Sequence, residues 1–344
     1  MRATRLLYGA LAVLLASGCS GSSADETVVP EPLGVVNVAE GETVRIGEWD
    51  ITVLSVDRDA TAEVMALDDY NVDLAPGEQF VTVAISASFR GENQAGPTSL
   101  WRSTHIYGEL PGGELVEADG AGECPNPPDE LRILTDVFGG GTLTGNVCFV
   151  AKTDEIENIA LVIDDRQNPD SIARFVLPAE GMVFSAPAVA ASEPVGDTLG
   201  TRGNPYPLGS VVRVGAWDVT VTGFNPDLTQ IITDEDRGVG PVTAGRQEAG
   251  IYVTMTNTGS EATSVFGTLM VRAVADSTAV SYGDGVYHCR LSETQLEQYS
   301  NVEPGASLSG HICWELLPEE SGSMVLYLEP TLTVEDDRVY FATH

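Results

Sequence analysis

The stretch GETVRIGEWDITVLSV, residues 41–56, returns later in the chain as GSVVRVGAWDVTVTGF, residues 209–224. Eight of the sixteen aligned positions are identical, and Trp49 aligns with Trp217. Apolar and polar residues alternate in both copies and β-branched residues are frequent, a pattern typical of strands with one buried face. We therefore expect a repeated β-rich module that packs each tryptophan in its core.

The repeat extends along both halves of the chain. Residues 81–91 align with residues 249–259, and TLTGNVCFVA at 142–151 aligns with SLSGHICWEL at 307–316. Turn signals such as Pro-Gly separate these segments, and no stretch shows a long apolar period of 3.6 residues. The pattern predicts an all-β protein with two tandem immunoglobulin-like β-sandwich domains.

Composition predicts where one domain ends and the next begins. Residues 186–200 are rich in Ala, Pro, Gly and Ser, so we expect an extended, mobile linker there. The first domain would then occupy residues 35–185 and the second residues 201–344. Since 43% of the residues are hydrophobic, a substantial core can form and wholesale disorder is not expected.

The first eighteen residues have the layout of a secretory signal peptide. Arg2 and Arg5 precede an apolar run of eleven residues, which is too short to span a bilayer. The small residues before Cys19 resemble the lipobox of bacterial lipoproteins, although Ala16 stands where leucine is usual. That resemblance implies a diacylglycerol thioether on Cys19, with acyl chains such as palmitate, and a polar tether over residues 19–34. The protein would then be anchored by lipid on the extracytoplasmic face of the cell membrane.

Charge narrows the range of partners. The chain has 17 Lys+Arg against 51 Asp+Glu, a net charge of −34. Such a chain repels phosphate backbones, so nucleic acid is excluded as a partner. An anionic membrane surface would repel it as well, so contact with the membrane is expected only through the lipid on Cys19.

Four cysteines besides Cys19 recur in the repeat. Cys124 matches Cys289 and Cys148 matches Cys313, which leaves two cysteines twenty-four residues apart in each copy. In an exported protein an even number of cysteines indicates disulfides. We predict one bridge within each module, Cys124–Cys148 and Cys289–Cys313.

A zinc site is the alternative for the second copy, because His288 and His311 lie beside its two cysteines and complete a chemically sound ligand set. The first copy has Glu123 and Asn146 at the matching positions but keeps both cysteines. A ligand set would not lose half of its members in one module, so the disulfides are favoured.

An acidic loop follows the tryptophan-bearing strand in both copies, and clustered carboxylates are the ligands that calcium prefers. Asp69-x-Asn71-x-Asp73 begins like an EF-hand loop, but Leu74 and Phe80 stand at its sixth and twelfth positions. A solvated acidic loop is therefore the default interpretation. The weak calcium candidates are Asp68, Asp69, Asp73, Asp234, Glu235 and Asp236.

The sequence offers no recognisable catalytic set. It lacks a Gly-x-Ser-x-Gly nucleophile motif, and none of its four histidines recurs between the copies. We expect a protein that is not an enzyme and that needs no cofactor.

A family resemblance covers both modules. Pro-Tyr-Pro-Leu-Gly-x-x-Val-x-Val-Gly-x-Trp-x-Val-x-Val at 205–221, followed by Asn-Thr-Gly at 257–259 and Pro-Gly-x-x-x-x-Gly at 304–310, resembles an immunoglobulin-like domain of unknown function. That domain recurs in lipoproteins of actinobacteria and other Gram-positive bacteria and is distantly similar to the secreted mycobacterial immunoprotective antigen. The resemblance implies a β-sandwich outside the membrane and no catalytic residues.

These observations predict a cell-surface lipoprotein that acts as a non-catalytic binding or scaffolding module at the bacterial envelope. Its partner would be an envelope protein or another surface ligand that the sequence does not identify. A calcium-binding or ion-responsive surface protein is the alternative, and an envelope enzyme of unknown substrate comes third.

Overall fold

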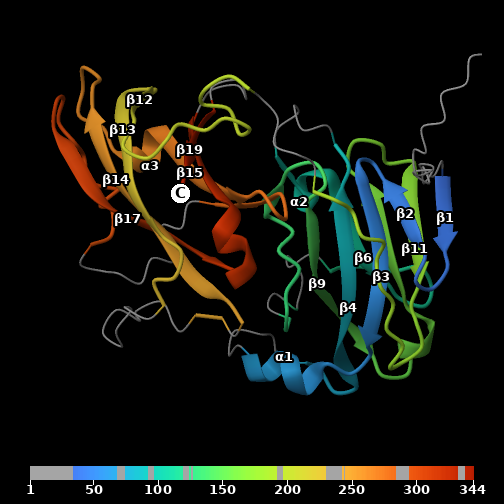
Figure 1. The fold of residues 1–344 in the computed structure, drawn as a ribbon. Coiled ribbons are helices and arrows are strands. Elements are labelled where there is room, and N and C mark those ends of the chain that lie inside the picture. Colours follow the sequence, from blue (N-terminus) through green and yellow to red (C-terminus); the bar gives the residue numbers. More distant parts are fainter. Residues whose placement is uncertain are drawn as a thin grey trace, which may run out of the picture.

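Both halves of the chain fold into mostly antiparallel β-sheets that pack face to face around apolar side chains. The computed structural model describes residues 34–67, 74–91, 97–118, 124, 127–191, 197–229, 242–243, 245–283, 294–331 and 338–344. In Figure 1 the first sandwich lies on the right, in blue and green, and the second on the left, in yellow to red. The predicted all-β sandwich fold is confirmed.

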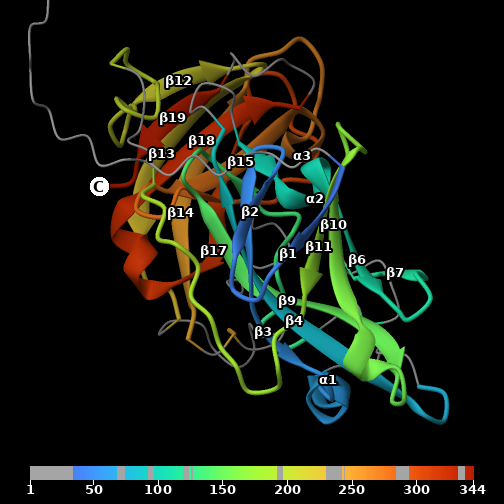
Figure 2. The ribbon, with the colours of Figure 1, turned by 90° about the vertical axis from the view of Figure 1, so that its right-hand side faces the viewer.

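The first sandwich begins with the strands of the leading repeat motif. One sheet has the order β2 (Thr43–Ile46), β3 (Trp49–Asp57), β4 (Glu78–Phe89) and β9 (Thr142–Lys152). The facing sheet has the order β1 (Gly34–Val38), β11 (Ser171–Val176), β10 (Ala160–Asp165), β6 (Thr104–Glu109) and β7 (Leu115–Glu117). Helix α1 (Thr61–Leu67) lies at the lower end of this sandwich in Figure 2.

The second sandwich repeats the arrangement. One sheet has the order β12 (Val211–Val214), β13 (Trp217–Asn225), β14 (Gln247–Asn257) and β17 (Ser307–Leu316). The facing sheet contains β19 (Val339–Ala342), β18 (Met324–Pro330), β15 (Leu269–Ala275) and β16 (Val280–Tyr282). The one-turn helices α2 (Leu100–Ser103) and α3 (Val265–Thr268) come just before β6 and β15, at matching places in the two halves.

The repeated Gly-x-Trp segment forms a tight turn between the first two strands of each motif. Gly47 and Gly215 have φ angles of +54° and +55°, in the left-handed region that favours glycine. The turn places Ile46 opposite Trp49 in the antiparallel ladder of β2 and β3. Glycine at this position therefore sets the register that directs the tryptophan inward.

Trp49 and Trp217 are completely buried, as the alternation of the repeat predicts. Each belongs to the main apolar cluster of its own sandwich, to which both sheets contribute. At about 25 cal/mol per Å², a tryptophan that buries about 200 Å² stabilises the fold by about 5 kcal/mol. The two tryptophans are therefore among the largest single contributions to the two cores.

Candidate functional site

The two sandwiches are joined by a continuous β-sheet. Strand β16 of the second half pairs with β8 (Asp136–Val137) of the first half through Val280 and Val137. Strand β5 (Thr98–Ser99) then pairs with β8 and completes a six-stranded sheet. The N–H of Phe138 donates to the carbonyl oxygen of Ala279 over 2.8 Å, which adds a backbone bond beyond the strands. The modules are thus held side by side by main-chain hydrogen bonds.

A buried ion pair crosses the same junction. Arg272 on β15 donates to the carboxylate of Asp136 on β8, and their side chains are only 19% and 8% exposed. A charge pair with so little water contact favours one arrangement of its elements, because separating the partners would leave a charge buried and unpaired. The pair therefore fixes how the second sandwich sits on the first.

An apolar cluster completes the junction. Phe138 packs with residues of the second sandwich, and its ring meets Tyr327 edge to face at 5.9 Å. The Arg202 guanidinium lies 4.6 Å above the Phe138 ring and pairs with Asp276 at 2.8 Å. Residues 186–191 of the expected linker lack helix and strand, but Ala191 packs against this cluster. The modules are therefore connected by a packed surface as well as by the chain between them.

A cleft of about 790 Å³ opens beside this junction and takes its walls from both sandwiches. This volume falls within the range of about 300–1,000 Å³ that is usual for ligand sites. Its charged and aromatic lining consists of Arg102, Glu130, Arg132, Asp136, Arg246, Arg272, Tyr282, Trp314, Glu315 and Glu320. Neither module alone supplies these residues, so the cleft exists only because the two modules are docked.

The cleft differs sharply in charge from the rest of the molecule. Its lining holds four arginines and four acidic residues, whereas the chain has 17 basic and 51 acidic residues. Burial lowers the pKa of Arg132 from its ordinary value, and the neighbouring Arg246 lowers it further, while Glu315 opposes both. Both guanidinium groups contact Glu315, Arg132 at its carboxylate over 4.0 Å and Arg246 at its carbonyl oxygen over 3.5 Å, so two like charges gather at one residue.

The acids of the cleft are largely engaged. Glu320 accepts hydrogen bonds from the Tyr282 hydroxyl and, at 2.7 Å, from Thr278. Burial and the adjacent Glu320 raise the pKa of Tyr282, so its phenol stays protonated at neutral pH. Burial likewise raises the pKa of Glu130. The arrangement offers hydrogen-bond donors and a neutral phenol, which suits binding of a polar ligand.

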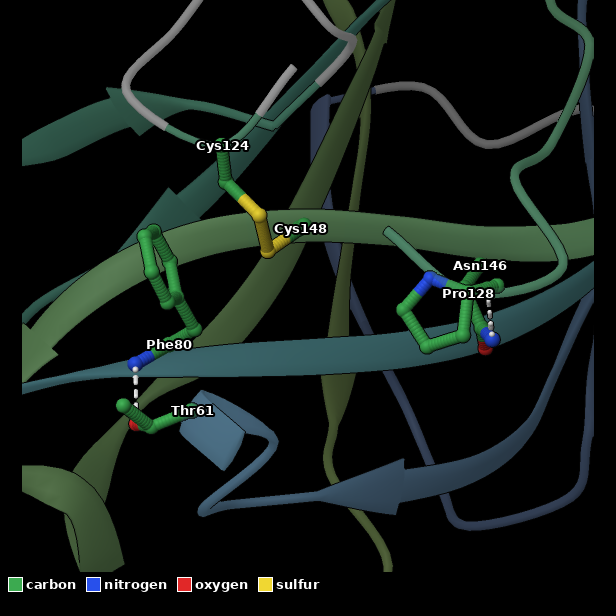
Figure 3. The surroundings of a disulfide bond; sticks show 6 residues. All are labelled: Thr61, Phe80, Cys124, Pro128, Asn146 and Cys148. Atoms are coloured by element: carbon green, nitrogen blue, oxygen red, sulfur yellow. Dashed lines mark hydrogen bonds between the residues drawn. A yellow bond between two sulfur atoms is a disulfide. The ribbon is translucent and has the colours of Figure 1, made fainter. Parts of the chain in front are cut away.

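The predicted Cys124–Cys148 disulfide is present, with the two Cα atoms 5.6 Å apart. Figure 3 shows it on the outer side of the β4–β9 ladder, near Phe80. The N–H of Phe80 donates to Thr61 Oγ1 over 3.1 Å, which ties helix α1 to the strand. The bridge belongs to a small apolar cluster with Phe80 and α1, separate from the main core.

The second predicted bridge is described only in part. Cys313 is fully buried on β17 and is disulfide-bonded. Cys289 and His288 lie outside the described residues, so the pairing Cys289–Cys313 stays a prediction. His311 is half-buried, with its Nδ1 at 3.0 Å from the Thr294 hydroxyl.

The remaining predicted sites also lie outside the described residues. This holds for the lipidation residue Cys19 and for the calcium candidates Asp68, Asp69, Asp73, Asp234, Glu235 and Asp236. Among the residues that the structure describes, no cluster of histidine, cysteine and carboxylate side chains could hold a metal ion. The lipid anchor and the calcium loops therefore stay predictions.

Sequence reasoning missed the cleft, although the repeat carried a signal for it. In the other copy its arginines are replaced by residues of a different kind. Arg102 matches Gly267, Arg132 matches Glu297, Arg246 matches Glu78 and Arg272 matches Tyr107. In an otherwise acidic chain, an arginine that is present in only one copy of the repeat indicates a role that the matching position of the other copy does not have.

In the described part of the chain, no helix has the length and apolar character needed to cross a membrane. No known protein-family model matches the chain, and no curated protein matches it.

The chain is similar to several solved structures. An uncharacterized β-sandwich protein from Clostridium difficile 630 is 14% identical, and the match covers 43% of this chain and 98% of that protein, with a TM-score of 0.28. A conserved hypothetical protein from Bacillus anthracis is 15% identical over 39% of this chain and 94% of its own, with a TM-score of 0.28. The yjhA protein from Bacillus subtilis is 15% identical over 40% and 99% of the two chains, with a TM-score of 0.27.

Proposed function

We propose that this chain is a lipid-anchored, non-catalytic binding module on the extracytoplasmic face of a bacterial membrane. The observation that carries the binding role is the cleft between the docked modules, which gathers four arginines in a chain of net charge −34. A cleft at a domain boundary, with a few polar groups directed at one place, is the usual form of a ligand site. The signal peptide and the lipobox-like Ala-Ser-Gly-Cys junction support the location.

The junction supports a scaffold that presents this cleft in one fixed shape. Backbone hydrogen bonds, the Arg272–Asp136 pair and the cluster around Phe138 hold the same pair of surfaces together. A preformed site loses little conformational entropy when its ligand binds. Both modules are needed for this cleft, because each module alone supplies only part of its walls.

The anchor is tested by replacing Cys19 in the native bacterium. Cys19→Ala should release the protein into the medium, because the thioether can no longer form. Ala16→Leu restores the usual residue of the lipobox and serves as the matched control, which should stay with the membrane fraction. Retention of Cys19→Ala in the membrane fraction would contradict the lipid anchor.

The binding role is tested by placing a photoreactive residue in the cleft of the anchored protein. Leu134 lines the cleft and is 71% exposed, whereas Val211 on β12 is 69% exposed and lies outside it. Irradiation of living cells should give a reproducible adduct from position 134 and none from position 211. Equal adducts at the two positions, or none at either, would contradict a ligand site in this cleft.

A further inference from the structure

We infer that the cleft binds an oxyanion, a carboxylate or phosphate group of a small organic ligand, between Arg132 and Arg246. This inference rests on the proposed binding role of the cleft and names the ligand class. Both side chains line the cleft, and Arg246 is one of the causes that lower the pKa of Arg132. An anion placed between two guanidinium groups would relieve their repulsion.

Among the described residues, the partners of these two cations are few. The ion pair of Arg132 is a contact of 4.0 Å with the Glu315 carboxylate, which is too long for a hydrogen bond. Arg246 donates to the backbone carbonyl of Glu315, at 3.5 Å. Within the part of the chain that the structure describes, both guanidinium groups therefore gather around Glu315 and keep N–H donors available for a ligand.

The negative charges of the cleft are better satisfied than the positive ones. Asp136 is paired with Arg272, and Glu320 accepts from Tyr282, Thr278 and the N–H of Leu317. Glu320 thus has three hydrogen-bond donors around its carboxylate, and Asp136 has a close guanidinium partner. Among the described residues, Arg132 and Arg246 are less fully paired than these two acids, so an anion fits between them better than a cation.

The geometry of the guanidinium group narrows the chemistry further. Its planar fork of donors matches the two oxygens of a carboxylate or phosphate, and such bidentate pairs are the strong ones. The cleft volume of 790 Å³ leaves room for more than a bare ion, and exposed Leu134 supplies an apolar wall beside the arginines. The ligand is therefore an organic acid or an organic phosphate.

The test is isothermal titration of the purified full chain with succinate, with glycerol 3-phosphate and with phosphatidylglycerol vesicles. Saturable binding of at least one probe is expected, and the double variant Arg132→Gln/Arg246→Gln should weaken it by at least about tenfold. Arg132→Lys keeps the charge but not the fork, so its loss should be intermediate. Binding of glycerol 3-phosphate without binding of vesicles would assign a soluble phosphate rather than a lipid head group.

Arg213→Gln is the matched control, because it removes one positive charge at a side chain that is 57% exposed and lies outside the cleft. It should leave the affinity unchanged.

The inference is overturned if no probe binds, or if the double variant binds as well as the parent chain. If no probe binds but position 134 still gives its adduct on cells, the binding role stands and only the ligand class is wrong. If a probe binds but no adduct forms, the oxyanion site stands and the cellular role fails.

Discussion

The two sandwiches share a backbone frame and differ in how they satisfy buried polar atoms. The Trp217 indole donates to Thr268 Oγ1 over 2.9 Å. The Trp49 indole N–H is buried without a hydrogen-bond partner among the described residues. The residue that matches Thr268 is Ser103, and both hydroxyls donate to the carbonyl oxygen four residues earlier, of Ser264 and of Ser99. Ser103 lacks the methyl group of Thr268, and the indole N–H of the matching tryptophan is hydrogen-bonded only beside the threonine.

The aspartate after each tryptophan shows a second difference. Asp50 is 5% exposed and accepts from Arg45 at 2.8 Å and from Arg90 at 2.6 Å. Asp218 is 32% exposed and pairs with Arg213 at 2.5 Å. The same residue type at the same place in the repeat is a buried, doubly paired charge in one module and a surface charge in the other.

The third difference is an apolar side chain in one module at the position of an acidic side chain in the other. Phe80 and Glu248 occupy matching positions and are both completely buried. Their N–H groups make the same hydrogen bond, to the hydroxyl of Thr61 in one copy and of Thr229 in the other, each over 3.1 Å. The backbone hydrogen bonds and turns are thus the same in the two modules, whereas the partners of matching side chains differ.

The largest expected effect concerns the disulfides. In the chain-entropy model, replacing Cys124 and Cys148 with Ser should lower the stability of the first module by about 3.5 kcal/mol. Thermal unfolding of the purified chain measures the loss. Cys313→Ser sharpens the comparison, because an equal loss would show that the second bridge closes a loop of similar length. A parent chain that reacts with a thiol reagent at Cys124 when folded would contradict the bridge.

The junction between the modules gives the next effect. Asp136→Ala removes the close partner of buried Arg272, leaves it the longer 3.9 Å pair with Glu329, and should cost about 3 kcal/mol. Asn301→Ala changes the matching residue of the second module, which is exposed, and should leave the melting temperature unchanged. Small-angle scattering should show a larger radius of gyration for Asp136→Ala only. Equal behaviour of the two variants would break the proposed asymmetry.

The paired aspartates predict a smaller and unequal effect. Asp50→Asn leaves two arginines facing a neutral amide in a buried place and should cost about 2 kcal/mol. Asp218→Asn removes an exposed pair and should leave the unfolding midpoint unchanged. Urea unfolding of the two variants makes the comparison directly. Equal midpoints would show that burial does not distinguish the two charges.

The smallest effects concern the tryptophan partners. Thr268→Val removes the acceptor of the Trp217 indole and should cost about 1.5 kcal/mol. Ser103→Thr gives the first module the residue of the second, and it should raise stability by about 0.5 kcal/mol if the added methyl group turns the hydroxyl toward the Trp49 indole. Tryptophan fluorescence during unfolding reports both changes. A Ser103→Thr variant that is less stable than the parent would show that the first core cannot accept the added methyl group.

Much of the fold could be predicted because its determinants are local and repeated. Alternation of apolar residues indicated the strands, although it did not indicate the turn at Gly47 that divides the first repeat motif into β2 and β3. The Cys124–Cys148 pairing followed from the repeat, since each copy holds its own two cysteines. These features depend on one module at a time, so the periodicity of the sequence contains them.

The cleft could not be predicted in the same way. It depends on how β8 meets β16, and a single pair of residues, Val137 and Val280, joins these strands. Contacts of this kind connect residues more than one hundred positions apart and follow no period. The signal that the sequence did hold for the cleft was the set of arginines that the other copy of the repeat lacks.

The junction also shows how two matching surfaces of the repeat differ in what they can receive. The second module has the same strand pair that receives a neighbour in the first, with Thr263 opposite Val302. Asn301 stands where the first module has Asp136, and Glu303 stands where it has Phe138. A third module docked in the same way would have to bury the Glu303 carboxylate in an apolar cluster, which is strongly unfavourable. Asn301 and Glu303 thus make the matching surface of the second module unsuited to the docking that Asp136 and Phe138 support in the first.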